Sequence, residues 1–153
     1  MITTTSPRYL RPGRFLRRVG IPIIELLVRR GFGPRGARQL AVRGRRSGEW
    51  RTVPVNPLHV DGVQYLVAPR GTTEWVRNLR AAGGGELRLG GRADVFAATE
   101  LDDIAKPPII REYLRRWKFE VGRFFESLDE SSSDAELLAV AAGFPVFRLS
   151  PAG

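Results

Sequence analysis

The chain of 153 residues contains no cysteine and one histidine, His59. Without cysteine it can form neither disulfide bonds nor a thiolate nucleophile. A zinc site normally takes several His or Cys ligands, so we expect no metal centre. A Ser-His-Asp triad would have to use His59, which lies in an alternating, strand-like segment without a nucleophile motif. The composition therefore argues against metal-dependent and triad-based hydrolytic chemistry.

Long hydrophobic runs are also missing. The apolar stretch of residues 21–28 is interrupted by Pro22 and Glu25, is too short to span a bilayer, and lacks a clear cleavage site after it. We therefore expect a cytoplasmic protein. The chain is 42% hydrophobic and 27% charged, which is ordinary for a soluble globular protein of one domain.

Positive charge is concentrated in the first third of the chain. Residues 1–51 hold 13 arginines and two glutamates, a net charge of +11, whereas residues 52–153 carry −2 and the whole chain carries +9. A field of this kind favours an anionic partner, which could be a phosphorylated ligand, an acidic lipid surface or nucleic acid.

The N-terminal part is expected to consist of an arm and a helix. Residues 1–12 are predicted to be a flexible arm, and residues 13–153 a single domain. From residue 13 to residue 30, apolar side chains recur at helical spacing with arginines beside them, which predicts a basic amphipathic helix kinked near Pro22. This helix either packs on its own domain or contacts an anionic membrane peripherally, at the inner face.

The rest of the chain alternates between strand-like and helical periodicity. Asp61-Gly62 is a strong hairpin signal, Thr72 or Thr73 can cap the helix that follows, and Ser133 with Glu136 resembles a capping box. The expected strands are residues 38–44, 51–60, 63–68, 86–90, 92–99 and 144–149, and the expected helices are residues 74–82, 107–127 and 134–141. This pattern predicts an α+β, mainly β fold: about six mostly antiparallel strands in a closed or partly closed barrel, with N-terminal, central and C-terminal helices packed outside.

The turn between the first two expected strands is the most informative segment. Arg45, Arg46 and Arg51 converge on it, and Gly44 and Gly48 let the backbone reverse sharply. Guanidinium groups and exposed turn amides together suit a phosphate or a carboxylate. The alternative is a charged hairpin tip in water.

An ordered set of motifs in this block resembles the deazaflavin-dependent nitroreductase family of actinobacteria, whose members use coenzyme F420. The resemblance covers about residues 35–100. It is carried by Gly-Arg-Arg-Ser-Gly at 44–48, Arg-Thr-Val-Pro at 51–54, Asp-Gly-Val-Gln-Tyr-Leu-Val-Ala-Pro-Arg at 61–70 and Trp-Val-Arg-Asn-Leu at 75–79. It implies a split β-barrel like that of the proteins that bind flavin mononucleotide (FMN), and FMN is the alternative cofactor.

The resemblance also implies a set of cofactor-binding residues. The basic turn and the strand after it would hold the phosphate, the strand residues beyond would lie beside the deazaflavin ring, and the cation at position 70 would meet the acidic tail of the cofactor. Two residues one helical turn apart on the short helix would face the same groove. The expected set is Arg45, Arg46, Ser47, Gly48, Arg51, Val53, Pro54, Ala68, Arg70, Trp75 and Asn78.

The implied activity is that of a reductase in which the cofactor carries the redox chemistry. A hydride would pass from the reduced deazaflavin to a small electron acceptor, for which the aromatic residues of the C-terminal third favour a lipophilic quinone, enone or nitro compound. The protein would supply position, charge and exclusion of water, which explains why no nucleophile or metal cluster stands out. The proton would come from solvent, Tyr65 or Tyr113. The resemblance allows a monomer or a homodimer.

Two other functions fit the same features. A non-catalytic protein that carries the deazaflavin would need the same basic groove. A nucleic-acid-binding barrel would also be basic. The basic stretch of residues 13–51, however, contains only three aromatic residues, Phe15, Phe32 and Trp50, which are too few to form a stacking platform for single strands. Nucleic acid is therefore not an expected partner.

Overall fold

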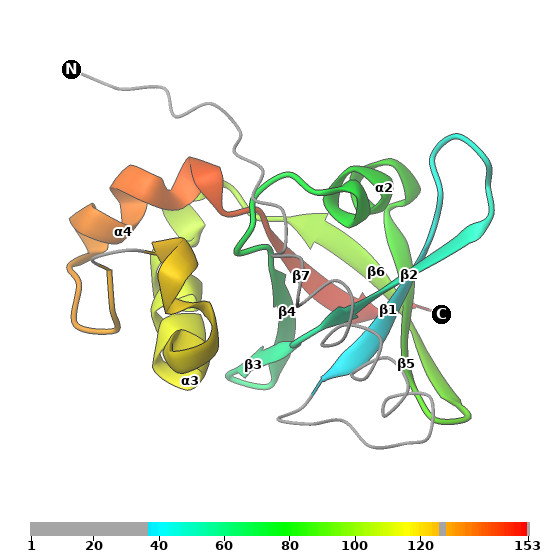
Figure 1. Cartoon of the computed structure of the whole chain (residues 1–153), viewed down its shortest axis with the longest axis horizontal. Coiled ribbons are helices and arrows are strands. Elements are labelled where there is room, and N and C mark those ends of the chain that lie inside the picture. The colour runs from blue at the N-terminus through cyan, green and yellow to red at the C-terminus, as the bar shows by residue number, and fades with distance from the viewer. Residues whose placement is uncertain (1–36, 126–127, 153) are drawn as a thin grey trace.

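The structure is a computed structural model that describes residues 37–125 and 128–152 (Figure 1). The predicted arm and the predicted helix 13–30 lie outside the described residues. The strands are β1 (Arg38–Arg43), β2 (Trp50–Val55), β3 (Leu58–Val60), β4 (Val63–Val67), β5 (Gly84–Leu89), β6 (Arg92–Glu100) and β7 (Val146–Pro151). The helices are α2 (Glu74–Ala82), η3 (Asp103–Ala105), α3 (Pro107–Phe125), α4 (Asp134–Val140) and η4 (Ala141–Gly143).

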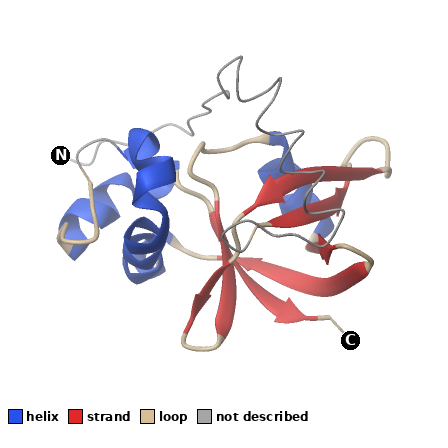
Figure 2. Cartoon of the chain, turned by 60° about the horizontal axis from the view of Figure 1, so that its bottom comes forward, coloured by secondary structure: helices blue, strands red, loops and turns tan. Residues whose placement is uncertain are grey.

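All seven strands belong to one antiparallel sheet, in the order β2-β1-β5-β6-β7-β4-β3. β2 and β3 are therefore the two edge strands, yet only residues 56 and 57 separate them in the chain. So short a link requires the sheet to curl until its edges approach each other, as Figure 2 shows. The result is a barrel that is split between β2 and β3, which confirms the predicted fold class.

One predicted strand is wrong in its extent. The sequence pattern predicts a single strand over residues 51–60, but the structure ends β2 at Val55 and starts β3 at Leu58. Pro57 has no amide hydrogen and restricts the backbone of Asn56, so the ladder is interrupted there. This break raises the strand count from the expected six to seven.

Buried side chains form two clusters, one on each face of the sheet. Leu40, Leu66, Leu87 and Phe147, from four strands, gather with residues of α2 on the inner face. On the outer face, a second cluster forms between β3, β4 and β7 and the helices α3 and α4, which lie together beside these strands in Figure 1. In β4, Leu66 belongs to the first cluster and Val67 to the second, because successive side chains point to opposite faces.

The predicted hairpin turn and the predicted capping box are confirmed, whereas Thr73 precedes α2 without making a side-chain capping bond. Asp61 and Gly62 both have positive φ, 50° and 78°, as a tight two-residue hairpin requires. Gly83 ends α2 in the left-handed conformation and donates its amide hydrogen to the carbonyl of Leu79 at 2.8 Å. Ser133 caps α4, with the reciprocal bonds of a capping box to Glu136.

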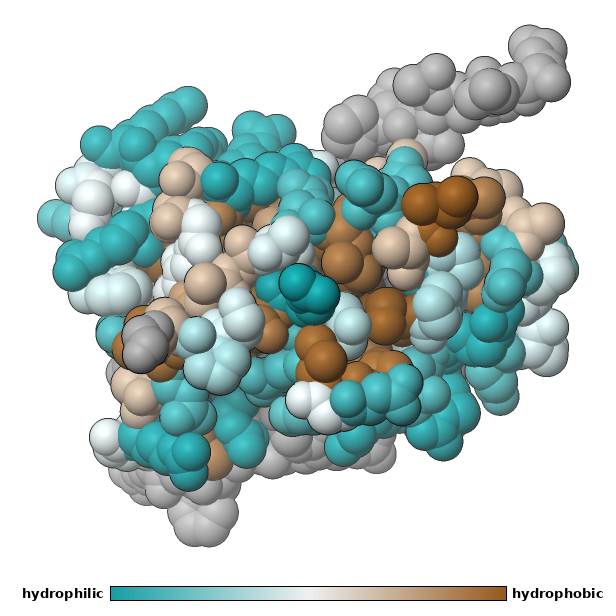
Figure 3. All heavy atoms as spheres, turned by 180° about the vertical axis from the view of Figure 1, so that it is seen from behind, coloured by the Kyte–Doolittle hydropathy of each residue, from teal (hydrophilic) through white to brown (hydrophobic). Residues whose placement is uncertain are grey.

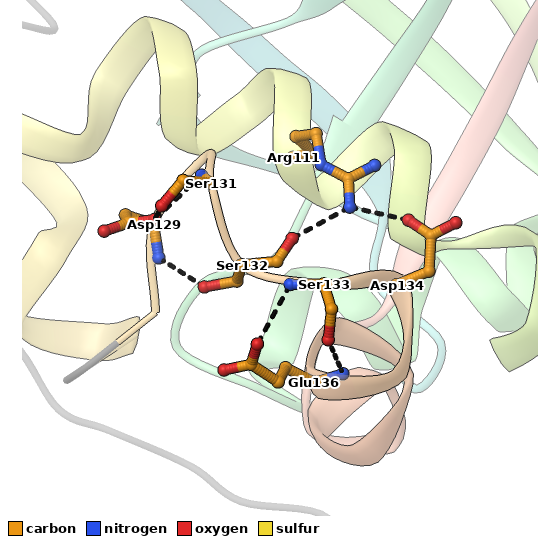
Figure 4. A network of polar contacts seen from close by, with 7 residues as sticks. All are labelled: Arg111, Asp129, Ser131, Ser132, Ser133, Asp134 and Glu136. Carbon is orange, nitrogen blue, oxygen red and sulfur yellow. Dashed lines mark hydrogen bonds and ion pairs between the residues drawn. The ribbon is translucent and has the colours of Figure 1, made fainter.

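The loop before α4 is held by a polar network (Figure 4). Arg111 of α3 donates to the carbonyl of Ser132 at 2.9 Å and to the carboxylate of Asp134 at 2.6 Å. Asp129 accepts hydrogen bonds from the amide and the hydroxyl of Ser131. These bonds fix α4 against α3, on the outer side of the sheet.

A close approach between the neighbouring strands β5 and β1 gives a test of the fold. A Cβ atom on Gly85 would lie 2.5 Å from the carbonyl oxygen of Ala41, on the neighbouring strand β1. We expect Gly85→Ala to lower the free energy of unfolding by about 1–3 kcal/mol, the usual cost of overpacking a core. Urea denaturation measures the loss. Gly91→Ala is the control, because nothing lies within 4 Å of its Cβ position. Equal stability of the two variants would contradict the close approach.

Candidate functional site

The basic turn between β1 and β2 is closed by its own backbone. The amide of Gly44 donates to the carbonyl of Glu49 at 2.8 Å, and the amide of Gly48 donates to the carbonyl of Gly44 at 2.9 Å. The hydroxyl of Ser47 accepts the amide hydrogen of Glu49 at 3.1 Å. The Gly48 amide, expected to be a donor to the cofactor, is therefore already in use within the turn. Gly48 therefore serves the turn itself: its positive φ of 72° allows the backbone to reverse direction between β1 and β2.

The turn is anchored to helix α2 by Arg45. Its guanidinium donates to the carboxylate of Glu74 and to the side-chain oxygen of Asn78, each at 2.8 Å, and its backbone amide donates to the same Asn78 oxygen at 3.1 Å. At the other end of α2, Arg80 forms two bonds to Glu100 of β6, at 2.8 and 2.7 Å. The helix is thus fixed at both ends.

A cavity of about 460 Å³ opens between this helix and strand β2. Strands β1 and β2 supply one wall, and the segment from Arg70 through the first turns of α2 supplies the other. The lining residues are Val42, Arg51, Thr52, Val53, Arg70, Thr73, Glu74, Trp75 and Asn78. Its size is within the range of sites for cofactor-sized ligands.

Five residues of the predicted cofactor site therefore meet around one cavity: Arg51, Val53, Arg70, Trp75 and Asn78. Trp75 also packs toward the inner core, with its ring 6.0 Å from that of Phe147. Asn78 is only 5% exposed. The geometry combines two guanidinium groups with a partly apolar wall, which suits a ligand that has an anionic end and a flat ring.

The other predicted residues lie away from the lining. Pro54 is the strand neighbour of Val53 and so points to the opposite face of β2. Ala68 is 1% exposed, its amide donates to the carbonyl of Pro145, and its carbonyl accepts from Gly71. The resemblance implies that the backbone of Ala68 contacts the ring, but both its amide and its carbonyl already take part in hydrogen bonds within the fold.

Three further predicted residues belong to the turn itself. Arg45 is engaged with Glu74 and Asn78, and Ser47 with Glu49. Arg46 is exposed and forms no ion pair or side-chain hydrogen bond with any residue that the structure describes. It remains the turn cation most accessible to a ligand.

The two candidate proton donors lie in the other cluster. Tyr113 is 3% exposed on α3 and packs on Trp117, with ring centroids 5.1 Å apart. Tyr65 is partly buried against the same cluster. Neither lines the cavity. Solvent is the proton source that this geometry favours.

The sequence reasoning missed Thr73 as a site residue. It occupies the position before the first residue of α2, but it makes no side-chain capping bond, and its hydroxyl oxygen is buried with no hydrogen-bond partner in the described structure. A threonine at this place was expected only as a possible cap. Its position on the cavity could not be read from the sequence.

The electrostatics at the start of α2 are dominated by Arg45. The hydrogen bond from this guanidinium lowers the pKa of Glu74 below its ordinary value of 4.5, and the charges of Arg77 and Arg46 act in the same direction. At neutral pH the carboxyl group of Glu74 is therefore ionised, and the positive charge of Arg45 balances its negative charge. Because its pKa is lowered on folding, its contribution to stability is present above the ordinary pKa and is lost as the pH falls through the lowered value.

Other features of the surface are less specific. A second hollow, of about 770 Å³, involves the hairpin between β3 and β4 and the strands β6 and β7. Seen from behind, hydrophobic patches are broken up by hydrophilic side chains (Figure 3). Within residues 37–125 and 128–152, no three His, Asp or Glu side chains are grouped to hold a metal ion. None of the helices in these same ranges is long and apolar enough to cross a membrane.

The curled, split sheet and the cationic cavity under α2 define a split-barrel protein suited to an anionic ring cofactor. Solved structures with the same fold include an F420-H2-dependent reductase, FDR-A, with 18% identity over 76% of this chain and 95% of that chain and a TM-score of 0.53. A second, described as a domain-swapped dimer, has 16% identity over 84% of this chain and 95% of that one, with a TM-score of 0.54. A third is the conserved hypothetical protein Rv2991 from Mycobacterium tuberculosis, with 13% identity over 76% and 73% of the two chains and a TM-score of 0.52.

The family itself is given by a match to the sequence profile of the F420H2-dependent quinone reductases, which covers residues 33–119. This is more than half of the chain, so the chain belongs to the F420H2-dependent quinone reductase family. The expected class of enzyme, an oxidoreductase, is confirmed, as is the resemblance found in the motifs. No match was found among curated protein sequences.

The anchor between turn and helix can be tested through Asn78. Asn78→Ala removes the acceptor of two hydrogen bonds from Arg45, so we expect the free energy of unfolding to fall by about 1–3 kcal/mol. Arg77→Ala is the control on the same helix, since Arg77 is exposed and should change stability by less than about 0.5 kcal/mol. Guanidinium denaturation measures both. Equal losses would show that Asn78 does not anchor the turn.

Proposed function

We propose that this chain binds reduced coenzyme F420 in the cavity between β2 and α2 and uses it to reduce a small lipophilic acceptor, with quinones as the first class. The convergence of Arg51, Arg70 and Trp75 on one cavity is the observation that carries the proposal. They come from two segments, strand β2 and the stretch from Arg70 into α2, which meet only in the folded protein.

The residues present fit the chemistry of this cofactor. The coenzyme has a phosphodiester and a glutamate tail at one end and a flat deazaflavin ring at the other. Arg51 and Arg70 supply cations on the lining, and Val42, Val53 and Trp75 supply an apolar wall. Guanidinium groups pair well with phosphate and carboxylate oxygens, and an apolar wall keeps water from the ring.

The protein's part in the reaction is binding and positioning. When bound, the reduced deazaflavin supplies the hydride, and with a proton from solvent a quinone becomes a hydroquinone. The chain places the ring against the wall formed by β2 and α2, while its cations hold the anionic end. Because α2 is fixed by Arg45 at one end and Arg80 at the other, this wall is rigid before the ligand arrives.

A fluorescence titration of the purified protein tests the proposal. We expect saturable binding of F420 and much weaker binding of flavin mononucleotide, which carries a phosphate but no glutamate tail. With the reduced cofactor, adding quinones, enones or nitro compounds in turn should abolish its absorbance. Tight binding without turnover across this panel would favour a deazaflavin carrier. Preference for flavin mononucleotide would contradict the proposed cofactor.

The cationic side chains give a sharper test. We expect Arg51→Ala to weaken F420 binding by about 1.5–3 kcal/mol, the range for a hydrogen bond to a charged group, and we expect the same of Arg46→Ala. Arg92→Ala is a charge-matched control, because Arg92 pairs with Asp94 and is absent from the cavity wall. If all three variants lost affinity equally, the effect would be one of net charge rather than of contact.

A further inference from the structure

One half of the sheet has an outer face that no described α-helix covers. In β1, β5 and β6 the side chains of Leu40, Leu87 and Phe96 belong to the inner core, so the residues between them point outward. Helices α3 and α4 pack on the outer face beside β3, β4 and β7, away from β1, β2 and β5 (Figure 1). Helix α2 packs on the inner face. The outer side chains of β1, β2, β5 and β6 are therefore open to a partner.

This surface, which we call the Trp50 face, consists of Arg43, Trp50, Arg88, Ala93 and Val95. Four large hydrophobic side chains stand exposed in the described part of the chain, and two of them lie here, Trp50 at 38% and Val95 at 54%. Ala93 is exposed on the same strand as Val95. An exposed aromatic and an exposed aliphatic side chain on one uncovered face are typical of an interaction surface.

The aromatic ring of the Trp50 face is flanked by two guanidinium groups. The Cζ atom of Arg43 lies 4.1 Å from the centre of the Trp50 ring, and that of Arg88 lies 4.9 Å from it. Arg88 pairs with Glu86 at 2.8 Å. Arg43 instead donates to the uncharged carbonyl of Gly48, at 3.1 Å, and forms no ion pair with a described residue. The face therefore combines an indole ring, held by cation–π contacts, with net positive charge.

The chain that leads into this face is strongly basic. Residues 1–36 contain eight arginines and one glutamate, and β1, a strand of the Trp50 face, begins at Arg38. This charge is thus tethered to the face by the chain itself. Clustered arginines are attracted to a membrane surface that contains acidic lipids, and indole rings favour the level of the lipid headgroups. The basic segment and the Trp50 face therefore suit the same kind of partner.

We propose that the Trp50 face is the surface by which this protein binds peripherally to an anionic lipid bilayer. In the bound state the Trp50 ring lies among the headgroups, Arg43 meets lipid phosphate, and Val95 adds apolar contact. A second copy of the chain suits the face less well. A symmetric contact would bring two copies of the same positive patch together.

The inference goes beyond the proposed function and does not depend on it. The face and the candidate cavity share strand β2, but Trp50 and Val95 are not among the residues that line the cavity. Binding of F420 and binding of vesicles can therefore be measured and altered separately. If both take place, a lipophilic acceptor dissolved in the bilayer is brought close to the cavity.

Vesicle sedimentation of the full chain tests the surface. The probes are vesicles of phosphatidylglycerol with phosphatidylcholine, and vesicles of phosphatidylcholine alone. We expect the wild type to bind only the anionic vesicles, and less at high salt. Val95→Glu should weaken this binding about fivefold or more, because it places an acid against an anionic surface. Ile104→Glu is the matched control, since Ile104 is an exposed aliphatic residue, at 79%, that lies on η3 and changes the net charge equally.

Tryptophan fluorescence locates the contact. We expect Trp50→Ala to weaken vesicle binding about tenfold, the loss expected when a large side chain gives up apolar contact. Anionic vesicles with brominated acyl chains should quench the fluorescence of the wild type, and Trp50→Phe should abolish the quenching. The other two tryptophans, Trp75 and Trp117, pack in the two core clusters. F420 binding and the thermal midpoint, measured without vesicles, should be the same in Val95→Glu and the wild type.

Four results would overturn the proposal. They are a wild type that ignores anionic vesicles, equal losses in Val95→Glu and Ile104→Glu, quenching that persists in Trp50→Phe, and a vesicle-free dimer that Val95→Glu dissociates. Equal binding by all variants would assign the contact to residues 1–36 alone and would also exclude the Trp50 face. If the wild type failed to bind F420 but the vesicle results followed the expected order, only the proposed function would be overturned.

Discussion

The architecture depends on one constraint of chain length. β2 and β3 are the opposite edges of a seven-stranded sheet, yet only residues 56 and 57 connect them. A flat sheet would place these edges far apart, at about 4.8 Å for each strand spacing. The sheet therefore curls, its inner side chains form one core, and the unpaired gap between β2 and β3 keeps the barrel split. The candidate cavity lies between the edge strand β2 and helix α2.

The described arginines around the cavity differ in what they contact. Arg45 connects the turn to α2, and Arg80 connects α2 to β6. Both are arginines whose bonds set the position of the cavity wall. Arg51 and Arg70 line the cavity itself. The Arg51 side chain is 62% exposed, and the one ion pair it forms with a described residue joins it to Glu49 at 4.0 Å. A long, exposed pair of this kind is weak, so Arg51 can turn to a ligand at little cost.

The sequence predicted local structure where the signal was local. The turn Asp61-Gly62, the end of α2 at Gly83 and the cap at Ser133 each depend on a few adjacent residues. The break near Pro57 was missed, because strand-like alternation continues across residues 56 and 57. For the site, the sequence identified an arginine-rich turn but could not show which carboxylate each arginine meets. Glu74, the partner of Arg45, is 29 residues away.

Thr73 and Ser133 occupy the same position before a helix, but only Ser133 makes a side-chain capping bond. At Ser133 the side chain caps the helix through the reciprocal bonds of the capping box with Glu136. At Thr73 the side chain makes no capping bond, and its hydroxyl oxygen has no hydrogen-bond partner among the described residues. Folding alone gains nothing from this arrangement, since a bond to the first-turn amides would stabilise α2. A buried polar group without a partner is uncommon in folded proteins, and this one lies on the lining of the candidate cavity.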